Sequence, residues 1–434
     1  MKKIQIGLIG FGTVGTGVVK ILLEKNELLQ ALVGAPLELK KIVDLDVERD
    51  RGFSLPEGLL SDRVSDILDD PEISIVIELI GGLEPARSLI LQALEKGKHV
   101  VTANKALLAH KGDELFQKAA EVERDIGFEA SVCGGIPVIL TLRQGVVANE
   151  IESMIGILNG TSNFILSRMT AEGLPYPVAL KEAQQRGFAE ADPTLDVEGL
   201  DAAHKLSILM NLAYGAPLDS PGLFVEGITR IGAMDIAFAR EFGFCIKLLA
   251  ICRKQGDKLE ARVHPAMIPQ NHMLANVQEA YNALLICGGF VGDILLYGQG
   301  AGMMPTGSAV ISDLVNIGRN IHKGISRRIP PSFSFKEFQG KGLTIQSVLE
   351  VVSKYYIRFS ALDRPGVLST IAGILGRHQI SIASVIQKGR EEGGAVPIVM
   401  MTHEAKESAV QEAIQEIDRL PVIHDRTVII RVEE

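Results

Sequence analysis

A glycine-rich turn between an apolar run and a helical stretch opens the chain and constrains its fold most strongly. From residue 3 the sequence reads KIQIGLIGFGTVGTGVVKILLEK, with helical spacing of the apolar residues after the turn. The pattern is G-x-G-x-x-G. Gly10 permits a tight turn, Gly12 lets backbone approach a pyrophosphate, and Gly15 allows close helix packing. We therefore expect a dinucleotide site, although a turn serving only strand-to-helix packing is the alternative; the candidate residues are Gly10, Phe11, Gly12, Thr13, Val14 and Gly15.

The end of the second predicted strand bears on the choice between NAD and NADP. It reads KKIVDLDVERDR. An acid at this position binds the ribose hydroxyls and disfavours a 2′-phosphate, so Asp44 or Asp46 favours NAD. Arg49 and Arg51 lie close enough in sequence to receive a phosphate instead. The cofactor is therefore NAD or NADP, with NAD favoured.

Apolar runs and helical stretches alternate over the first part of the chain. This alternation predicts an α/β fold that begins with a Rossmann-type parallel-sheet domain over residues 1–140, with helices expected at 86–95 and 112–123. Longer β-type runs mixed with helices predict an α+β domain over 141–302, followed by a helix at 303–322. A Pro- and Gly-rich stretch at 323–350 indicates a linker. Residues 351–434 follow a β-α-β-β-α-β pattern.

Composition limits the setting of the protein. The chain has 434 residues and a net charge of −9, so nothing in the overall balance attracts nucleic acid or an anionic membrane. Four cysteines lack C-x-x-C spacing and indicate free thiols in the cytoplasm. No apolar segment is long enough to span a bilayer.

An acid-rich stretch, GFAEADPTLDVEGLDAAHK at 187–205, contains the most informative charges. Asp196 and Glu198 suit the N-cap and first turn of a helix, where carboxylates meet free N–H groups. Asp201 and Lys205 are spaced i, i+4 and share one helix face. An exposed salt bridge would explain that pair, but a lysine held by a carboxylate can also move a proton as hydride moves.

Several stretches together resemble homoserine dehydrogenase of the long bacterial form with a C-terminal ACT domain. They occur in the family's order and cover the first 322 residues; the most specific are GILNGTSNFIL at 156–166 and EADPTLDVEGLDAAHK at 190–205. The resemblance implies oxidation of L-homoserine to L-aspartate 4-semialdehyde with NAD(P)+, or the reverse, in threonine, methionine and isoleucine biosynthesis.

The resemblance also implies roles for individual residues. Lys205 would carry the proton, Asp201 would orient that lysine and the substrate hydroxyl, and Lys105 would lie near the nicotinamide. Substrate would be bound by Glu190, Asp196, Gly160 and Thr161, where an ordinary N-G turn at Asn159 is the alternative reading. Gly302 and Thr306 would contact the cofactor where the helix at 303–322 packs back onto the nucleotide domain.

A monovalent cation, Na+ or K+, is implied by the same resemblance. Its ligands would be one carboxylate and backbone carbonyls from Glu129, Val132, Gly134 and Ile136, hard oxygen donors that suit such ions. Phe188 departs from the family pattern, in which many members have tyrosine, so a hydroxyl is absent there. The domain at 141–302 would also contribute to a homodimer or homotetramer.

The C-terminal module resembles the start of an ACT domain over 355–387. Pro365 and Gly366 suit a turn into a helix whose residues Ile371, Ile374 and Leu375 would cover a sheet. Such modules pair edge to edge and bind an amino acid, so feedback by L-threonine is the family expectation. A module that only dimerises is the alternative.

Two other functions compete with this one. Cys133 could be the nucleophile of a semialdehyde dehydrogenase, although that chemistry needs a histidine base and none is evident in the sequence. A non-catalytic sensor could bind nucleotide and amino acid, but it would have no need of Glu190, Asp201 and Lys205.

Overall fold

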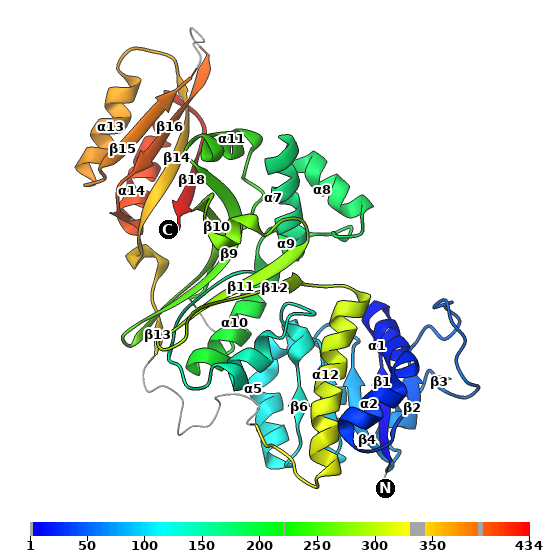
Figure 1. Ribbon diagram of the computed structural model, residues 1–434. Helices are drawn as coiled ribbons and strands as arrows, with labels where there is room; N and C mark the ends of the chain where they lie inside the picture. Colours follow the sequence, from blue (N-terminus) through cyan, green and yellow to red (C-terminus); the bar gives the residue numbers. More distant parts are fainter. Residues whose placement is uncertain (1–2, 220–221, 330–342, 389–393) are drawn as a thin grey trace. The chain divides into compact units, whose positions relative to one another are not determined.

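The computed structural model describes residues 3–219, 222–329, 343–388 and 394–434 (Figure 1). Contacts divide the chain into two compact units. The first unit comprises Met1–Met154, His204–Pro221 and Tyr281–Leu343, and the second comprises Ile155–Ala203, Gly222–Ala280 and Thr344–Glu434. Most of the expected linker at 323–350 lies outside the described residues. Its last residues form a short strand, β13 (Thr344–Ile345), and a 3-10 turn at Val348–Glu350.

A six-stranded parallel sheet forms the centre of the first unit. Its order is β3-β2-β1-β4-β5-β6, and every pairing is parallel. The strands are β1 (Ile4–Ile9), β2 (Leu37–Val43), β3 (Leu60–Ser61), β4 (Ile73–Glu78), β5 (His99–Thr102) and β6 (Ile126–Gly127). This order places the carboxyl end of β1 at the centre of one sheet edge, where α/β sheets bind ligands. The predicted Rossmann-type sheet is confirmed.

Helices pack against this sheet through apolar side chains. They are α1 (Thr13–Glu24), α2 (Asn26–Val33), α3 (Ser65–Leu68), α4 (Ala86–Glu95), α5 (Lys105–Glu121) and α12 (Met303–His322); a short helix, α6 (Val138–Leu140), follows the 3-10 turn at Glu129–Ser131. Buried residues of β1, α1 and α12 share one core, which includes Ile6, Val18 and Leu314. Figure 1 shows α12 running beside α1.

The helix expected at 112–123 is wrong at its start, because α5 begins seven residues earlier, at Lys105. Asn104 caps the helix: its side-chain oxygen accepts a hydrogen bond from the Leu107 N–H at 3.1 Å. Gly112 therefore lies inside the helix. A Cβ at Gly112 would come within 2.5 Å of the Leu218 side chain, so this glycine permits close packing and is not a helix boundary.

The remaining strands of the first unit form an antiparallel pair, β11 (Tyr281–Gly288) and β12 (Gly292–Gln299). Two elements run through both units: β7 (Ile151–Ile157) and α10 (Leu200–Tyr214).

The second unit is built on a sheet in which β10 pairs with four other strands, β8, β9, β13 and β18. β9 (Phe244–Gln255) pairs with β10 (Lys258–Pro269) in antiparallel fashion, and β8 (Phe224–Val225) and β13 pair with β10 in parallel. The unit's other helices are α7 (Gly160–Glu172), α8 (Tyr176–Gln185), α9 (Thr194–Val197) and α11 (Ala233–Glu241).

The C-terminal module continues this sheet. Its strands and helices are β14 (Val352–Leu362), α13 (Val367–Arg377), β15 (Ile382–Gln387), β16 (Ala395–Thr402), α14 (Glu407–Ile417) and β18 (Ile423–Val432), with a short β17 (Ala405–Lys406) before α14. The expected β-α-β-β-α-β order is confirmed, with strand order β18-β14-β16-β15. Ile371, Ile374 and Leu375 are buried, as expected. β18 also pairs with β10, at Ala266 and Met267, so one sheet runs from β9 to β15 within this unit.

Candidate active site

The glycine turn is shaped to approach a phosphate closely. Gly10 has φ of 99°, in the left-handed region that favours glycine, and a Cβ at Gly15 would lie 2.2 Å from the Gly10 carbonyl oxygen. A Cβ at Gly12 would meet no atom within 4 Å, so open space lies beside the start of α1. Gly12 also leaves the helix without a side-chain cap. The first N–H groups of α1 are therefore available to an anion, which fits a dinucleotide pyrophosphate.

The tip of β2 holds this turn in place. The Phe11 N–H donates to the Asp44 carboxylate at 2.5 Å, and Arg51 Nε donates to the Phe11 carbonyl at 2.9 Å. The Arg51 guanidinium also lies 4.4 Å from the centre of the Phe11 ring. Asp46 and Arg49 are exposed, and the Asp46 carboxylate accepts the Arg49 N–H at 3.2 Å. Of the four charges considered from sequence, Asp44 and Arg51 thus shape the turn, whereas Asp46 and Arg49 face solvent.

The start of α12 contains the remaining candidate cofactor residues. Gly302 has φ of 130° and its carbonyl accepts the Thr306 N–H at 3.1 Å, which begins the helix. Thr306 is buried. A Cβ at Gly17 would lie 2.2 Å from the Met303 carbonyl, so α1 and α12 touch through backbone close to the glycine turn. Lys105, at the first residue of α5, is half-buried.

Asn159 joins two carboxylates of the acid-rich stretch. Its Nδ2 donates to Asp196 Oδ1 at 2.7 Å and to Asp201 Oδ2 at 2.8 Å. Its side-chain oxygen accepts the Ser162 N–H at 2.8 Å and caps α7. The N-G pair at 159–160 is therefore a helix start and not a hairpin turn. Sequence reasoning missed the bridge, although an Asn before G-T-S at a helix start was a visible capping signal.

The helix expected to begin at Asp196 is wrong in its start. α9 ends at Val197 and α10 begins at Leu200, because Gly199 adopts φ of 82° and interrupts the helix. Asp196 consequently lies inside α9, and Glu198 follows the last residue of α9. The Asp196 side chain is turned to Asn159 and its carbonyl accepts the Ser162 hydroxyl at 2.8 Å.

Asp201 and Lys205 lie one turn apart on α10, and both are buried, at 3% and 7% exposure. Two charged side chains at this depth need partners, which weakens the reading of an exposed surface salt bridge. Thr161 donates from its hydroxyl to the Phe188 carbonyl at 2.6 Å, whereas Glu190 is exposed. Phe188 packs its ring against Phe164, with ring centres 4.8 Å apart, and lacks the hydroxyl that a tyrosine would have at this position.

The predicted cation ligands lie in a tightly curled loop. Cys133 and Gly134 both have positive φ, 57° and 51°, and a Cβ at Gly134 would come within 2.5 Å of the Gly300 carbonyl. The Ile136 carbonyl accepts the Val138 N–H at 2.8 Å. Val132 is fully buried. No cluster of three or more His, Cys, Asp or Glu side chains suited to a metal occurs among the described residues, so any cation here would depend on backbone oxygens.

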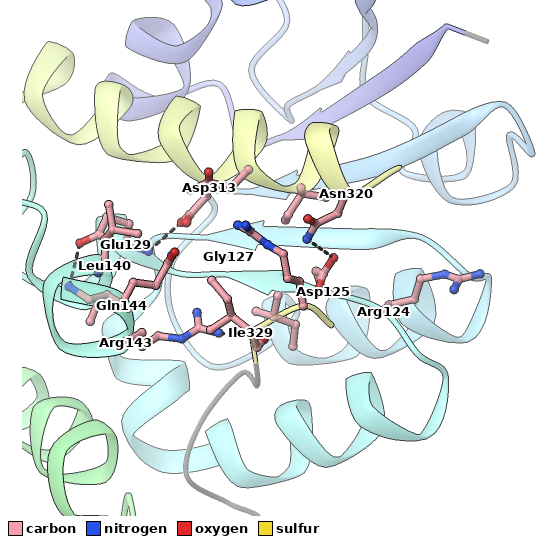
Figure 2. A pocket seen from close by; sticks show the side chains of 15 residues that line it. Arg124, Asp125, Gly127, Glu129, Leu140, Arg143, Gln144, Asp313, Asn320 and Ile329 are labelled. Atoms are coloured by element: carbon pink, nitrogen blue, oxygen red, sulfur yellow. Dashed lines mark hydrogen bonds between the residues drawn. The ribbon is translucent and has the colours of Figure 1, made fainter. Parts of the chain in front are cut away.

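Glu129 belongs to a buried charge cluster beside this loop, shown in Figure 2. Its carboxylate accepts the N–H groups of Ile139 and Leu140, both at 2.8 Å, and its own N–H donates to Asp313 on α12 at 2.7 Å. Burial, with the charge of Asp313, raises the pKa of Glu129 to about 7, and burial raises the pKa of Asp313 to about 7. Arg143 lines the same pocket, and its positive charge acts against this rise in pKa for both carboxyl groups.

The alternative nucleophile, Cys133, is fully buried. A thiol at that depth is inaccessible to a substrate, which argues against the semialdehyde dehydrogenase reading.

A search of the described residues for a helix with the length and apolar character of a membrane span finds none.

Comparison with known proteins agrees with this architecture along the whole chain. Family models match at residues 10–129 (homoserine dehydrogenase, NAD-binding domain), 137–315 (homoserine dehydrogenase) and 355–422 (ACT domain). The homoserine dehydrogenase of Neisseria gonorrhoeae is 41% identical over 433 residues, which cover 100% of this chain and 99% of that protein.

Solved structures give the same result. The crystal structure of a homoserine dehydrogenase from Thiobacillus denitrificans has a TM-score of 0.91 at 44% identity, covering 100% of this chain and 99% of that one. A hyperthermophilic archaeal homoserine dehydrogenase in complex with NADPH has a TM-score of 0.62 at 26% identity, covering 73% of this chain and 97% of that one.

The fold and the site together define an NAD(P)-dependent oxidoreductase that acts on a CH–OH group and has a C-terminal ACT domain. The matched NAD-binding domain includes the glycine turn, and the residues around Asn159 lie within the matched catalytic domain. The chain belongs to the homoserine dehydrogenase family.

Proposed function

We propose that the chain interconverts L-homoserine and L-aspartate 4-semialdehyde by proton transfer through Lys205, with Asp201 orienting that lysine. The observation that carries this proposal is the pair of buried charges one turn apart on α10, with Asp201 also held by Asn159 at 2.8 Å. A buried carboxylate keeps a lysine in a fixed position, and positioning by neighbours suits lysine to acid–base work. In oxidation Lys205 accepts the γ-hydroxyl proton, and in reduction it returns a proton to the aldehyde oxygen.

Other residues would bind and position the substrate. Glu190, exposed at the end of its loop, would pair with the substrate ammonium group. Asp196 would share substrate binding with the start of α7, where Gly160 and Thr161 offer backbone and hydroxyl groups. Lys105 would act beside the nicotinamide, which when bound accepts or donates the hydride.

For the cofactor, we propose a preference for NAD. Asp46 is exposed beside the turn and can accept hydrogen bonds from ribose hydroxyl groups. Arg51, in contrast, already donates hydrogen bonds to the carbonyls of Phe11, Arg49 and Asp46. Arg49 is the side chain that could still receive a 2′-phosphate. The archaeal relative, in contrast, was solved in complex with NADPH. The ratio of kcat/KM for NAD+ and NADP+ tests it.

A monovalent cation, Na+ or K+, would bind Glu129 and the carbonyls of Val132, Gly134 and Ile136. The buried carboxylates of Glu129 and Asp313 support this proposal, because Arg143 brings one positive charge to the two carboxylates and a cation would supply a second. Such an ion would supply a fixed positive charge and hold the loop in place. Activity measured in chloride salts of Na+, K+ and a large organic cation tests it.

Regulation by an amino acid, with L-threonine as the first candidate, is proposed for the ACT domain at 355–422. A homodimer or homotetramer is the proposed assembly and the cytoplasm the proposed location, in keeping with four free cysteines. Light scattering tests the proposed assembly, and an assay of activity with added L-threonine tests the proposed regulation.

The central experiment follows absorbance of the reduced nicotinamide with L-homoserine. Lys205→Ala should lower kcat by about 10²- to 10⁴-fold while nucleotide binding, measured by fluorescence titration, is unchanged. Glu190→Ala should mainly raise the KM for homoserine. Absence of homoserine-dependent reduction of either nucleotide by the wild type would overturn the proposed function.

A further inference from the structure

A chain of contacts in the second unit links the C-terminal module to the carboxylates of the active site. It begins at Arg431 on β18, whose side chain is 2% exposed. Two of its nitrogens donate to Glu407 at the start of α14, at 2.6 and 2.8 Å. Glu407 also accepts hydrogen bonds from the Tyr355 hydroxyl and the Gln411 amide. The contacts within the module therefore hold the guanidinium in place by themselves, without its contacts outside the module.

The third contact of Arg431 leads out of the module. Its Nη1 donates to Glu226 Oε2 at 3.0 Å, and its guanidinium lies 4.8 Å from the centre of the Phe224 ring. The segment 224–226 is also bound to β10, because β8 pairs with that strand and the Glu226 N–H donates to the Val263 carbonyl at 2.8 Å. The position of Glu226 is thus set from two sides.

The residues after Glu226 touch the joint between α9 and α10. A Cβ at Gly227 would lie 2.2 Å from the Val197 carbonyl, so the two backbones are in direct contact. The Ile228 N–H donates to the same carbonyl at 2.8 Å, and the Thr229 hydroxyl donates to Glu198 at 3.1 Å. A shift of segment 224–229 would therefore move residues 197–199.

Those residues separate the two active-site carboxylates. Asp196 precedes the joint, Asp201 follows it, and Asn159 binds both side chains. A Cβ at Gly199 would lie 3.2 to 3.4 Å from the Val225 and Val263 side chains and the Glu226 carbonyl, so the joint has little room to adjust on its own. The spacing of the two carboxylates consequently depends on where segment 224–229 lies.

We propose that the Arg431–Glu226 ion pair is a positioning device through which the C-terminal module sets the placement of Asp196 and Asp201. Glu226 is then a positioning residue for homoserine and does not contact it. The inference rests on the proposed roles of those two aspartates. Glu226 suits a test because its side chain is 33% exposed and lies beside a cavity of about 430 Å³, so it can be replaced without disturbing the buried Arg431–Glu407 pair.

The test compares steady-state kinetics and thermal unfolding of the full-length wild type, Glu226→Ala and Glu226→Gln. Glu226→Ala should lower kcat/KM for L-homoserine about fivefold, with the KM of the nucleotide and the unfolding temperature unchanged. Glu226→Gln keeps an acceptor for Arg431 and should fall between. Glu350→Ala is the matched control: it removes an ion pair with Lys258 of β10 that has no contact with the joint, and it should behave as wild type.

A double-mutant cycle with Asn159→Ala separates this role from a merely structural one. If both residues act on the same carboxylates, the losses in kcat/KM will be less than multiplicative. Wild-type homoserine kinetics in Glu226→Ala, or equal losses for nucleotide and homoserine, would overturn the inference. An inactive wild type would overturn both proposals, whereas an active wild type impaired by Asp201→Asn but not by Glu226→Ala would overturn this one alone.

Discussion

At the scale of single residues, Asn159 determines how the acid-rich stretch is used. One amide nitrogen lies within 2.8 Å of two carboxylates that are five residues apart in sequence, and its oxygen caps α7. Carboxylates this close repel each other, and a shared donor offsets that repulsion. Asn159 therefore couples a helix start to the spacing of Asp196 and Asp201.

Replacing Asn159 with Asp keeps the shape and the cap but removes both donated hydrogen bonds and adds a third carboxylate. We expect kcat/KM for homoserine to fall about 10- to 100-fold, the range for losing a hydrogen bond to a charged group. Nucleotide affinity, measured by fluorescence, should not change. Unaltered homoserine kinetics would show that the bridge has no part in catalysis.

Lys247 on β9 offers a prediction about pH. It is buried, donates to the Asn163 side chain at 3.1 Å and to the Val277 carbonyl at 2.5 Å, and burial lowers its pKa to about 8 from 10.5. At pH values between these two pKa values, Lys247 is protonated in the unfolded chain and deprotonated in the folded chain. Stability should therefore rise with pH across this window, and the cost of burying the charge is fully present below pH 8.

The measurement is chemical denaturation of the wild type and Lys247→Met from pH 7.5 to 10.5. Over this pH range, the free energy of unfolding of the wild type should rise by up to about 3 kcal/mol relative to that of the variant. Lys258→Met, a change at an exposed lysine of β10, should follow the wild type. Parallel curves for wild type and Lys247→Met would contradict the prediction.

At the scale of elements, α1 has two glycines with different duties. A Cβ at Gly12 would meet no atom within 4 Å, and a pyrophosphate would lie in that open space. A Cβ at Gly17 would lie 2.2 Å from the Met303 carbonyl of α12, so only glycine allows this close approach of the two helices. The first glycine concerns the ligand and the second concerns helix packing. Two single-methyl substitutions can separate them.

Gly12→Ala should raise the KM of the nucleotide about tenfold or more, because a methyl group would occupy the approach to the phosphates, while the unfolding temperature remains as in wild type. Gly17→Ala should lower stability by about 1–3 kcal/mol, since α12 must move away from α1. Steady-state kinetics and calorimetry distinguish the two results. A loss of stability in Gly12→Ala without a change in KM would contradict the assignment.

At the scale of the whole molecule, the C-terminal module is part of a larger sheet within the second unit. β18 pairs with β10, and the Glu433 N–H donates to the Met267 carbonyl at 2.9 Å. Glu433 also pairs with Arg253 at 2.7 Å and with the buried Arg262 at 2.6 Å. Stability of this unit thus depends on a residue next to the last one in the chain.

Glu433→Gln removes one of the two carboxylates that pair with Arg253 and the buried Arg262; Glu260 is the other. We expect a fall of about 3 kcal/mol in the free energy of unfolding, as for broken buried pairs. Glu434→Gln is the control, because its ion pair with Lys354 is exposed and such pairs contribute little. Equal stability of the two variants, measured by urea denaturation, would contradict a structural role for Glu433.

The sequence by itself determined the parallel-sheet nucleotide domain, the glycine turn and the C-terminal module. Each depends on spacing within one or two elements: three glycines in six residues, or apolar residues repeating along a helix such as α13. The same local spacing placed Asp201 and Lys205 on one helix face, and both proved to be buried. Their roles, like those of the other site residues taken from the family resemblance, remain predictions.

Only the tertiary structure decided which distant groups meet. Asn159 lies 37 and 42 residues from the carboxylates it binds, and Glu129 lies 184 residues from Asp313. No periodicity reports such contacts, because they depend on where loops from different elements converge. For the same reason Asp196 was predicted as a helix cap: the left-handed turn at Gly199 and its packing against Val225 and Val263 cannot be read from the residues beside it.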